Sequence, residues 1–503
     1  MVVLDASVVN VALPGMQLAL TLGATGQQWV VNAYTVTFAG LLLLLAGRAA
    51  DLFGRRRVFL IGLTLFIVSS LLGGLATNGA WLIAARAAQG AGGAVLAPTS
   101  LSLLITSHPD PGRRLRALRV WSATASCAAA IGVVCGGLLT HYLGWRWVLF
   151  INVPVGVLLL GASAAVLVGG RPPRQGGRLD VLGAITVTAG LSALVYGIVS
   201  TATSQWSSLH TPAALIAGLT LLAAFVLVEA RVAEEPLAPL HLFRRRPLVI
   251  ANCVAVGLGC AQFGMYYFMS LYLQQVKGWS ALAAGLAFLP SGLTSLTTSL
   301  SLRRLPSHTD PRLQLVCGPL LTVAGLLWLS RLTPEASYPA SILGPLVLFG
   351  LGMGSTFVPV TALATEGMPS HQAGLASALV NSARQFGGAV GLAAMAAVAG
   401  ARAPGRFPAS TLTAGYDRAF LVPAAASVAG IALTLRLHGR RRRVRAHVPV
   451  LVPTRALAPR VVAASGDDGA AHDEMFVGRS TTATRRMHSA RTARGAARQE
   501  GQP

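Results

Sequence analysis

The sequence predicts an all-α protein that crosses a lipid bilayer about fourteen times. Hydrophobic residues make up 53% of the 503 residues and charged residues only 11%, whereas soluble proteins carry about 25% charged residues. The mean hydropathy is +0.62 over the whole chain. Apolar runs of about 20 residues, enough to cross a hydrocarbon core of about 30 Å as a helix, recur at regular intervals. These observations exclude a soluble multi-domain protein.

Each apolar run defines one predicted span: residues 1–13, 29–46, 58–77, 81–105, 117–141, 147–168, 180–200, 213–229, 248–273, 282–302, 313–330, 340–363, 373–400 and 418–437. The first run is shorter than the others, because such a helix rises only about 20 Å. Either the helix continues through Pro14 towards Leu22, or the first span lacks an upstream segment. We favour the missing segment.

Arginine residues alternate between the loops in a pattern that predicts the orientation. The arginines concentrate in alternate loops, and the loops between them carry little positive charge. Because positively charged loops stay in the cytoplasm, we expect a protein of the cell membrane with both termini in the cytoplasm. The arginine-rich segments are 48–57, 113–119, 171–178, 231–246, 303–312 and 440–443.

The remaining composition argues against other classes of protein. The net charge of +24 comes from arginines in loops and in the tail, so it indicates retention of charge on one side of the membrane rather than nucleic-acid binding. The five cysteines lie in apolar spans without C-x-x-C spacing, which predicts no metal site and no disulfide. No nucleophile–base set or phosphate-binding loop is present, so we expect no catalytic residues and no cofactor.

Asp5 is the one acidic residue that lies clearly within a predicted span. A carboxylate inside a membrane is costly and is usually functional. Arg86, in the fourth span, lies at a similar depth: about 8 Å from the outer helix end, against about 13 Å for Asp5. We therefore expect Asp5 and Arg86 to face each other and to couple transport to protons. A static ion pair, or Arg86 reaching towards the surface, are the alternatives.

Other polar and aromatic residues within spans are candidates for a substrate path. Arg384 is a second deep cation, and Asn381 and Gln385 flank it on the same span. Lipid contact would be costly for this group, so it should face the protein interior. Aromatic and amide side chains of other spans are suited to line a site for an apolar or cationic organic molecule: Asn10, Trp29, Tyr34, Trp121, Gln262 and Tyr266.

A short loop at residues 47–57 predicts a cytoplasmic gate. Gly47 and Gly54 permit tight turns, and Asp51 precedes a helix whose dipole favours a carboxylate. Arg55 and Arg56 are expected to reach the facing half of the protein, so that this contact forms and breaks during transport. A simple topology anchor is the alternative.

Glycines within the spans predict close helix packing. Gly90, Gly132, Gly136 and Gly137 show spacings that let helix backbones approach one another. After residue 437 the composition becomes rich in Arg, Ala, Ser and Thr, which predicts a disordered basic tail over 438–503. Its arginines are suited to contact anionic lipid head groups or to serve as a positive anchor.

Several motifs resemble those of one transporter family. Residues 4–14, 47–58, 86–90 and 144–154 are similar, in this order, to segments of the major facilitator superfamily and its fourteen-helix drug:proton antiporter branch. The resemblance implies two six-helix bundles, at 1–168 and 241–437, with two extra helices inserted at 169–240. It also implies a monomer that exports small apolar or cationic compounds, such as drugs or antibiotics, against protons by alternating access.

Two positions depart from the family pattern. Val133 stands where the antiporter motif of the fifth helix has proline, and Leu52 replaces a usual basic residue. The change at Val133 keeps proton-coupled uptake open as an alternative to export. A membrane sensor or scaffold that does not transport, and that binds a partner through its basic tail, is the other alternative.

Overall fold

The computed structural model describes residues 1–44, 50–107, 110–167, 180–203, 209–233, 239–301, 311–368, 370–400 and 408–445. Within these ranges the regular secondary structure is helical. Contacts divide the chain into a unit that ends at His447 and a second unit, Val448–Pro503. The second unit, and with it most of the predicted tail, lies outside the described residues.

Every predicted span overlaps with helical structure in the described residues. The elements are α1 (Val2–Ala19), α2 (Ala24–Leu44), α3 (Ala50–Phe53), α4 (Arg55–Gly74), α5 (Gly79–Ser107), α6 (Pro111–Tyr142), α7 (Trp147–Phe150), α8 (Asn152–Val166), α9 (Val181–Thr203), α10 (His210–Arg231), η2 (Leu240–Arg244), α11 (Arg246–Leu271), η3 (Tyr272–Val276), α12 (Ala281–Ala287), α13 (Leu289–Ser301), α14 (Pro311–Leu329), η5 (Tyr338–Leu343), α15 (Gly344–Thr365), α16 (Ser370–Ala399) and α17 (Ala409–Arg445). Among the described residues, nine helical segments are long and apolar enough to cross a membrane.

Two helix boundaries differ from the prediction. The first helix does not stop near Leu13 but continues through Pro14 to Ala19, as in the alternative that we did not favour. Pro14 has no N–H to bond the carbonyl of Asn10, and Ser270 Oγ of α11 donates to that carbonyl at 2.9 Å instead. A neighbouring helix thus satisfies the freed backbone group, which makes an internal proline tolerable in a membrane helix. At the other end, α17 extends past residue 437 to Arg445.

Local side chains explain where several helices begin. Asp110 is the N-cap of α6: its carboxylate accepts from the backbone N–H of Arg113 at 2.7 Å, and Pro111 occupies the first helical turn. Ser280 caps α12 in the same way, and the side chain of Asn78 accepts from the backbone of Trp81 at the start of α5. These polar groups satisfy N–H donors that have no partner within the helix.

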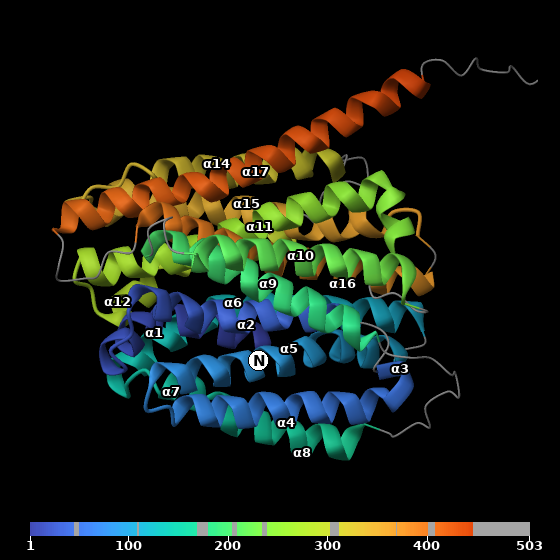
Figure 1. Ribbon diagram of the computed structural model, residues 1–503, viewed down its shortest axis with the longest axis horizontal. Coiled ribbons are helices and arrows are strands. Elements are labelled where there is room, and N and C mark those ends of the chain that lie inside the picture. The colour runs from blue at the N-terminus through green and yellow to red at the C-terminus, as the bar shows by residue number, and fades with distance from the viewer. Residues whose placement is uncertain are drawn as a thin grey trace, which may run out of the picture. The chain divides into compact units, whose positions relative to one another are not determined.

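The helices form two groups with α9 and α10 between them. Helices α1 to α8 pack mainly among themselves, as do α11 to α17. Figure 1 shows the green α9 and α10 between the blue N-terminal helices and the yellow-to-red C-terminal helices. α9 packs on α2, on α16 and on α10. It therefore contacts both groups along one side, while α6 joins them on another through contacts with α12 and α13.

Glycines allow the closest approaches of α6. A Cβ atom at Gly136 would lie 2.8 Å from the carbonyl oxygen of Val8 in α1. One at Gly137 would lie 2.8 Å from the carbonyl oxygen of Ala281 in α12. Because real Cβ atoms do not approach this closely, these positions require glycine for α6 to contact both neighbours at once. Gly90 of α5 lies in the same way against the backbone of Tyr34 in α2.

Large apolar side chains cover the outer faces of the peripheral helices. Leu158 of α8 is 74% exposed and Ile216 of α10 is 64% exposed. Exposed apolar surface of this extent is what lipid covers in a membrane protein.

We predict that Gly136→Val destabilises the protein by about 1–3 kcal/mol, because the new side chain would push α6 away from α1. The loss is measured as a lower melting temperature of the purified protein in detergent. Gly161→Val is the matched control, since a Cβ at Gly161 of α8 meets nothing within 4 Å. Equal melting temperatures for the two variants would contradict the packing role of Gly136.

Candidate functional site

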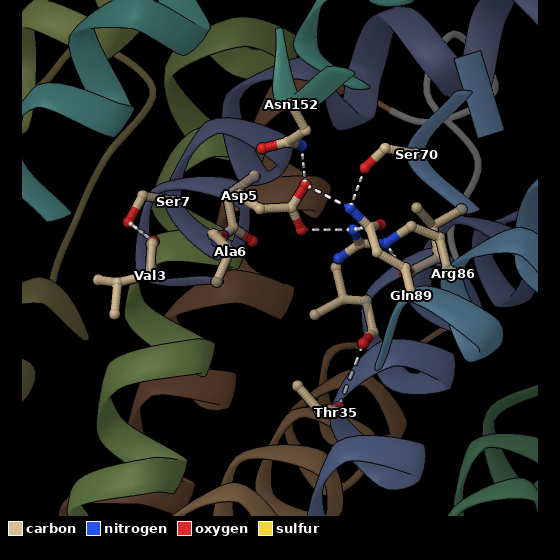
Figure 2. A network of polar contacts seen from close by, with 12 residues as sticks. Val3, Asp5, Ala6, Ser7, Thr35, Ser70, Arg86, Gln89 and Asn152 are labelled. Atoms are coloured by element: carbon tan, nitrogen blue, oxygen red, sulfur yellow. Dashed lines mark hydrogen bonds and ion pairs between the residues drawn. The ribbon is translucent and has the colours of Figure 1, made fainter. Parts of the chain in front are cut away.

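The carboxylate of Asp5 is the centre of a buried polar network. Asp5 lies in the first turn of α1, and its side chain is fully buried. Its Oδ2 accepts from Nη1 of Arg86 at 2.7 Å. Its Oδ1 accepts from Nε2 of Gln89 at 2.8 Å and from Nδ2 of Asn152 at 2.7 Å. Figure 2 shows these groups converging on the carboxylate from other helices.

Arg86 is itself satisfied on several sides. Its Nε donates to the carbonyl oxygen of Val30 at 3.2 Å, and its Nη1 also donates to Oε1 of Gln89. The guanidinium carbon lies 4.5 Å from the centre of the Tyr34 ring, within the range of a cation–π contact. Only 2% of the Arg86 side chain is exposed, so this cation does not reach towards the surface.

The network compensates for the cost of burying two charges. An isolated ion in a low-dielectric interior loses its hydration, and a buried pair is tolerated when good geometry and further hydrogen bonds replace that water. Here each carboxylate oxygen of Asp5 has a donor, and Gln89 also donates to Oγ of Ser70 at 2.6 Å.

Three members of the network were not predicted from the sequence as site residues: Gln89, Asn152 and Ser70. Gln89 follows Arg86 by three residues, so both lie on one face of α5. The three-residue spacing from Arg86 could therefore have identified Gln89 as a site residue from the sequence. Asn152 and Ser70 come from α8 and α4, far along the chain from Asp5, and no local pattern relates them to it.

Arg384 forms a second polar group near the middle of α16. Its Nη1 donates to Oε1 of Gln262 in α11 at 2.9 Å. Its guanidinium carbon lies 5.6 Å from the centre of the Phe357 ring of α15. Its Nε is buried without a hydrogen-bond partner.

The other residues that we predicted to line a substrate path make separate contacts. Tyr266 packs against the rings of Phe288 and Phe349 within the C-terminal group, and Trp29 contacts Tyr196 of α9. Asn381 donates to the carbonyl of its own helix at Ser377. The side chain of Trp121 lies outside the described residues.

Several buried polar atoms in the central helices have no protein partner. They include Oδ1 of Asn10, the hydroxyl of Tyr34, Oγ of Ser382, Oε1 of Gln385 and both amide atoms of Asn32. Buried polar groups are normally hydrogen-bonded, so a concentration of unpartnered ones indicates a place for water or a polar ligand.

The gate loop is only partly described. Gly47 and the side chain of Asp51 lie outside the described residues. Gly54 has a φ of +89° before α4, a conformation that favours glycine. Arg56 donates from Nη2 to the carbonyl oxygen of Ala164 in α8 at 2.7 Å. This contact lies within the N-terminal group of helices, so the expected bridge from Arg56 to the facing half is not formed in this conformation.

No metal site is evident in the part of the chain that the structure describes. No cluster of three or more His, Cys, Asp or Glu side chains there is suited to hold a metal ion. A hollow of about 400 Å³ lies beside α14 and η5, where Trp328, Arg331 and Ser341 line it. It contains none of the central polar residues, so it is not the candidate site.

Comparison with known proteins identifies the family. The sequence profile described as "Major Facilitator Superfamily" matches residues 1–392. The chain belongs to the Major Facilitator Superfamily. This confirms the resemblance drawn from the motifs and the predicted all-α membrane fold. Members of this superfamily are transporters and not enzymes, so the chain is a multi-pass membrane transporter whose ligands are small molecules.

Similar members of the Major Facilitator Superfamily carry names of export and resistance. The chain is 44% identical to the cephamycin export protein CmcT of Amycolatopsis lactamdurans, with 84% of this chain and 86% of that protein covered. It is 40% identical to the puromycin resistance protein pur8 of Streptomyces alboniger, with 86% and 87% covered. It is 34% identical to the tetracenomycin C resistance and export protein of Streptomyces glaucescens, with 81% and 75% covered.

Solved structures share the fold. The crystal structure of tetrameric PepTSo2 matches with a TM-score of 0.57 at 15% identity, covering 88% of this chain and 98% of that one. The human organic anion transporter MFSD10 matches with a TM-score of 0.53 at 17% identity, covering 86% and 98%.

We predict that Asp5→Asn and Arg86→Gln each destabilise the protein by about 3 kcal/mol, because each leaves the other charge buried and unpaired. The double variant should recover part of this loss, giving a coupling energy of about 1–3 kcal/mol. Chemical unfolding in mixed micelles measures all three. Asp5→Asn combined with Arg436→Gln, an exposed arginine of α17, is the control pair, and it should show no coupling. Additive losses in Asp5→Asn/Arg86→Gln would show that the pair is not formed.

Proposed function

We propose that this transporter exports small organic compounds, antibiotics among them, across the cell membrane in exchange for protons. In this proposal both termini lie in the cytoplasm and the two groups of helices alternate their opening around a central site. Export of an antibiotic is named for the relatives CmcT and the tetracenomycin C protein, which favours export over uptake or a sensor role. Their similarity extends over most of both chains.

The observation that carries the proton step is the environment of Asp5. It is fully buried, its charge is paired with Arg86, and its other contacts come from neutral donors. Neutralising Asp5 by a proton frees Arg86 to change partners. A change of charge at this point can therefore bias the packing of α1 against α5 and α8, which is what coupling requires.

Contacts between the two groups of helices support an alternating mechanism. Gln274 of η3 donates from Nε2 to the carbonyl of Val11 at 3.0 Å, next to the bond from Ser270 to Asn10. Nearer the end of α1, Gln275 donates from Nε2 to Oε1 of Gln17 at 3.1 Å. With the termini in the cytoplasm, these bonds lie towards the outer side. We infer a conformation closed on that side, which opens when the bonds break.

We predict that wild-type protein in inside-out vesicles moves protons when a transported compound is added, and that Asp5→Asn abolishes this movement. The reason is that asparagine retains the size of the side chain but cannot take up a proton. A pH-sensitive dye outside the vesicles measures the flux over a panel of compounds. Asn381→Asp added to Asp5→Asn is the control: it places a carboxylate on another helix, α16, and we expect that it does not restore the flux. Unchanged flux in Asp5→Asn would refute the proposed proton role.

We also predict that the double variant Ser270→Ala/Gln274→Leu shifts the protein towards opening on the outer side. Each change removes a side-chain donor to a backbone carbonyl of α1: Ser270 donates to Asn10, and Gln274 donates to Val11. Spin labels at Leu18 and Leu421, both exposed, should show a larger share of long distances. Ser330→Ala, which removes a hydroxyl bonded within its own helix end, is the control. An identical distance distribution in the double variant would contradict this gate.

A further inference from the structure

We infer that Arg384 is the anion-binding part of the substrate site, and that the exported compound carries a carboxylate or another oxyanion. This inference rests on the proposed export function and specifies the class of compound. The sequence alone suggested an apolar or cationic compound. The charges and contacts in the central helices favour an anionic one.

The first argument is the state of the Arg384 guanidinium. Within the described part of the chain, Arg384 has no carboxylate partner: its Nη1 donates to the neutral amide oxygen of Gln262, and its Nε donor is buried without a partner. It lies near the middle of α16, where a charge is most costly in a membrane protein. The ring of Phe357 provides partial compensation only.

Arg86 offers an internal comparison. The two residues are of the same type and both lie within membrane helices, but Arg86 is bonded to a carboxylate, an amide and a backbone carbonyl. Asp5 is committed to Arg86 and to two amide donors, so it does not neutralise Arg384. In the described central helices, the positive charge of Arg384 is therefore not neutralised by a carboxylate. Its guanidinium is available to bind a ligand.

The surroundings of Arg384 fit an amphipathic anion. A guanidinium binds a planar oxyanion through two parallel hydrogen bonds. On the same helix, Oγ of Ser382 and Oε1 of Gln385 are also buried without a partner. The Phe357 ring, which is 46% exposed, offers an apolar surface beside the charge. A cationic compound would meet repulsion from Arg384 at this point.

The test compares matched acids and amides. The probes are 2-naphthoate with 2-naphthamide, anthracene-2-carboxylate with its amide, and 1-pyrenebutyrate with its amide. Binding to the purified full chain in detergent is measured by ligand-induced thermal stabilisation. Wild-type protein should bind each acid about 10- to 100-fold more tightly than its amide, the range of a charge-assisted hydrogen bond. Arg384→Gln should abolish this preference, and Arg384→Lys should retain part of it.

Unchanged amide binding in Arg384→Gln shows that this variant is folded. The matched control is Arg436→Gln, which removes an exposed positive charge. It should keep the full preference for acids. The inference is overturned if wild-type protein binds acid and amide equally or binds neither. It is also overturned if the preference survives in Arg384→Gln. Absence of compound-driven proton movement would refute the proposed exchange instead, and would leave the acid–amide comparison intact.

Discussion

The buried ion pair between Asp5 and Arg86 is the interaction on which the rest of the N-terminal helices depends. At 2.7 Å and with almost no exposure of either side chain, the pair is stable only while amide and carbonyl groups from α2, α5 and α8 replace the lost water. Those groups fix how α1 sits against its neighbours. In the proposed exchange with protons, this pair is where neutralisation of a charge would change the packing of α1.

The two groups of helices meet through contacts of contrasting chemistry. At α6, glycine lets the backbones of α6 and α12 approach closely, so the contact is one of close backbone packing. Between α1 and η3, side-chain amides and a serine donate to carbonyls beside Pro14. Helices can slide along each other at such glycine contacts, whereas a hydrogen bond is either formed or broken. We regard the first as a surface for movement and the second as the bond that holds one conformation.

Arg384 and Arg86 illustrate how context decides the role of one residue type. Both are cations within apolar helices, and local sequence around each is rich in small residues and amides. One is neutralised inside the protein and the other retains free donors. The number of cations in the interior does not by itself indicate the charge of the transported compound. What matters in our inference is which cation is not already paired with a carboxylate of the protein.

The sequence by itself determined the helical membrane fold, because the period and length of apolar runs reflect the thickness of a bilayer regardless of tertiary contacts. It also singled out Asp5, since a carboxylate in such a run is conspicuous. It did not determine that α1 continues through Pro14, because the compensating donor, Ser270, comes from α11. Likewise Asn152 and Ser70 joined the network, and Arg384 remained without a carboxylate in the described residues, through tertiary packing. Partners distant along the chain leave no local pattern, and only the folded structure brings them together.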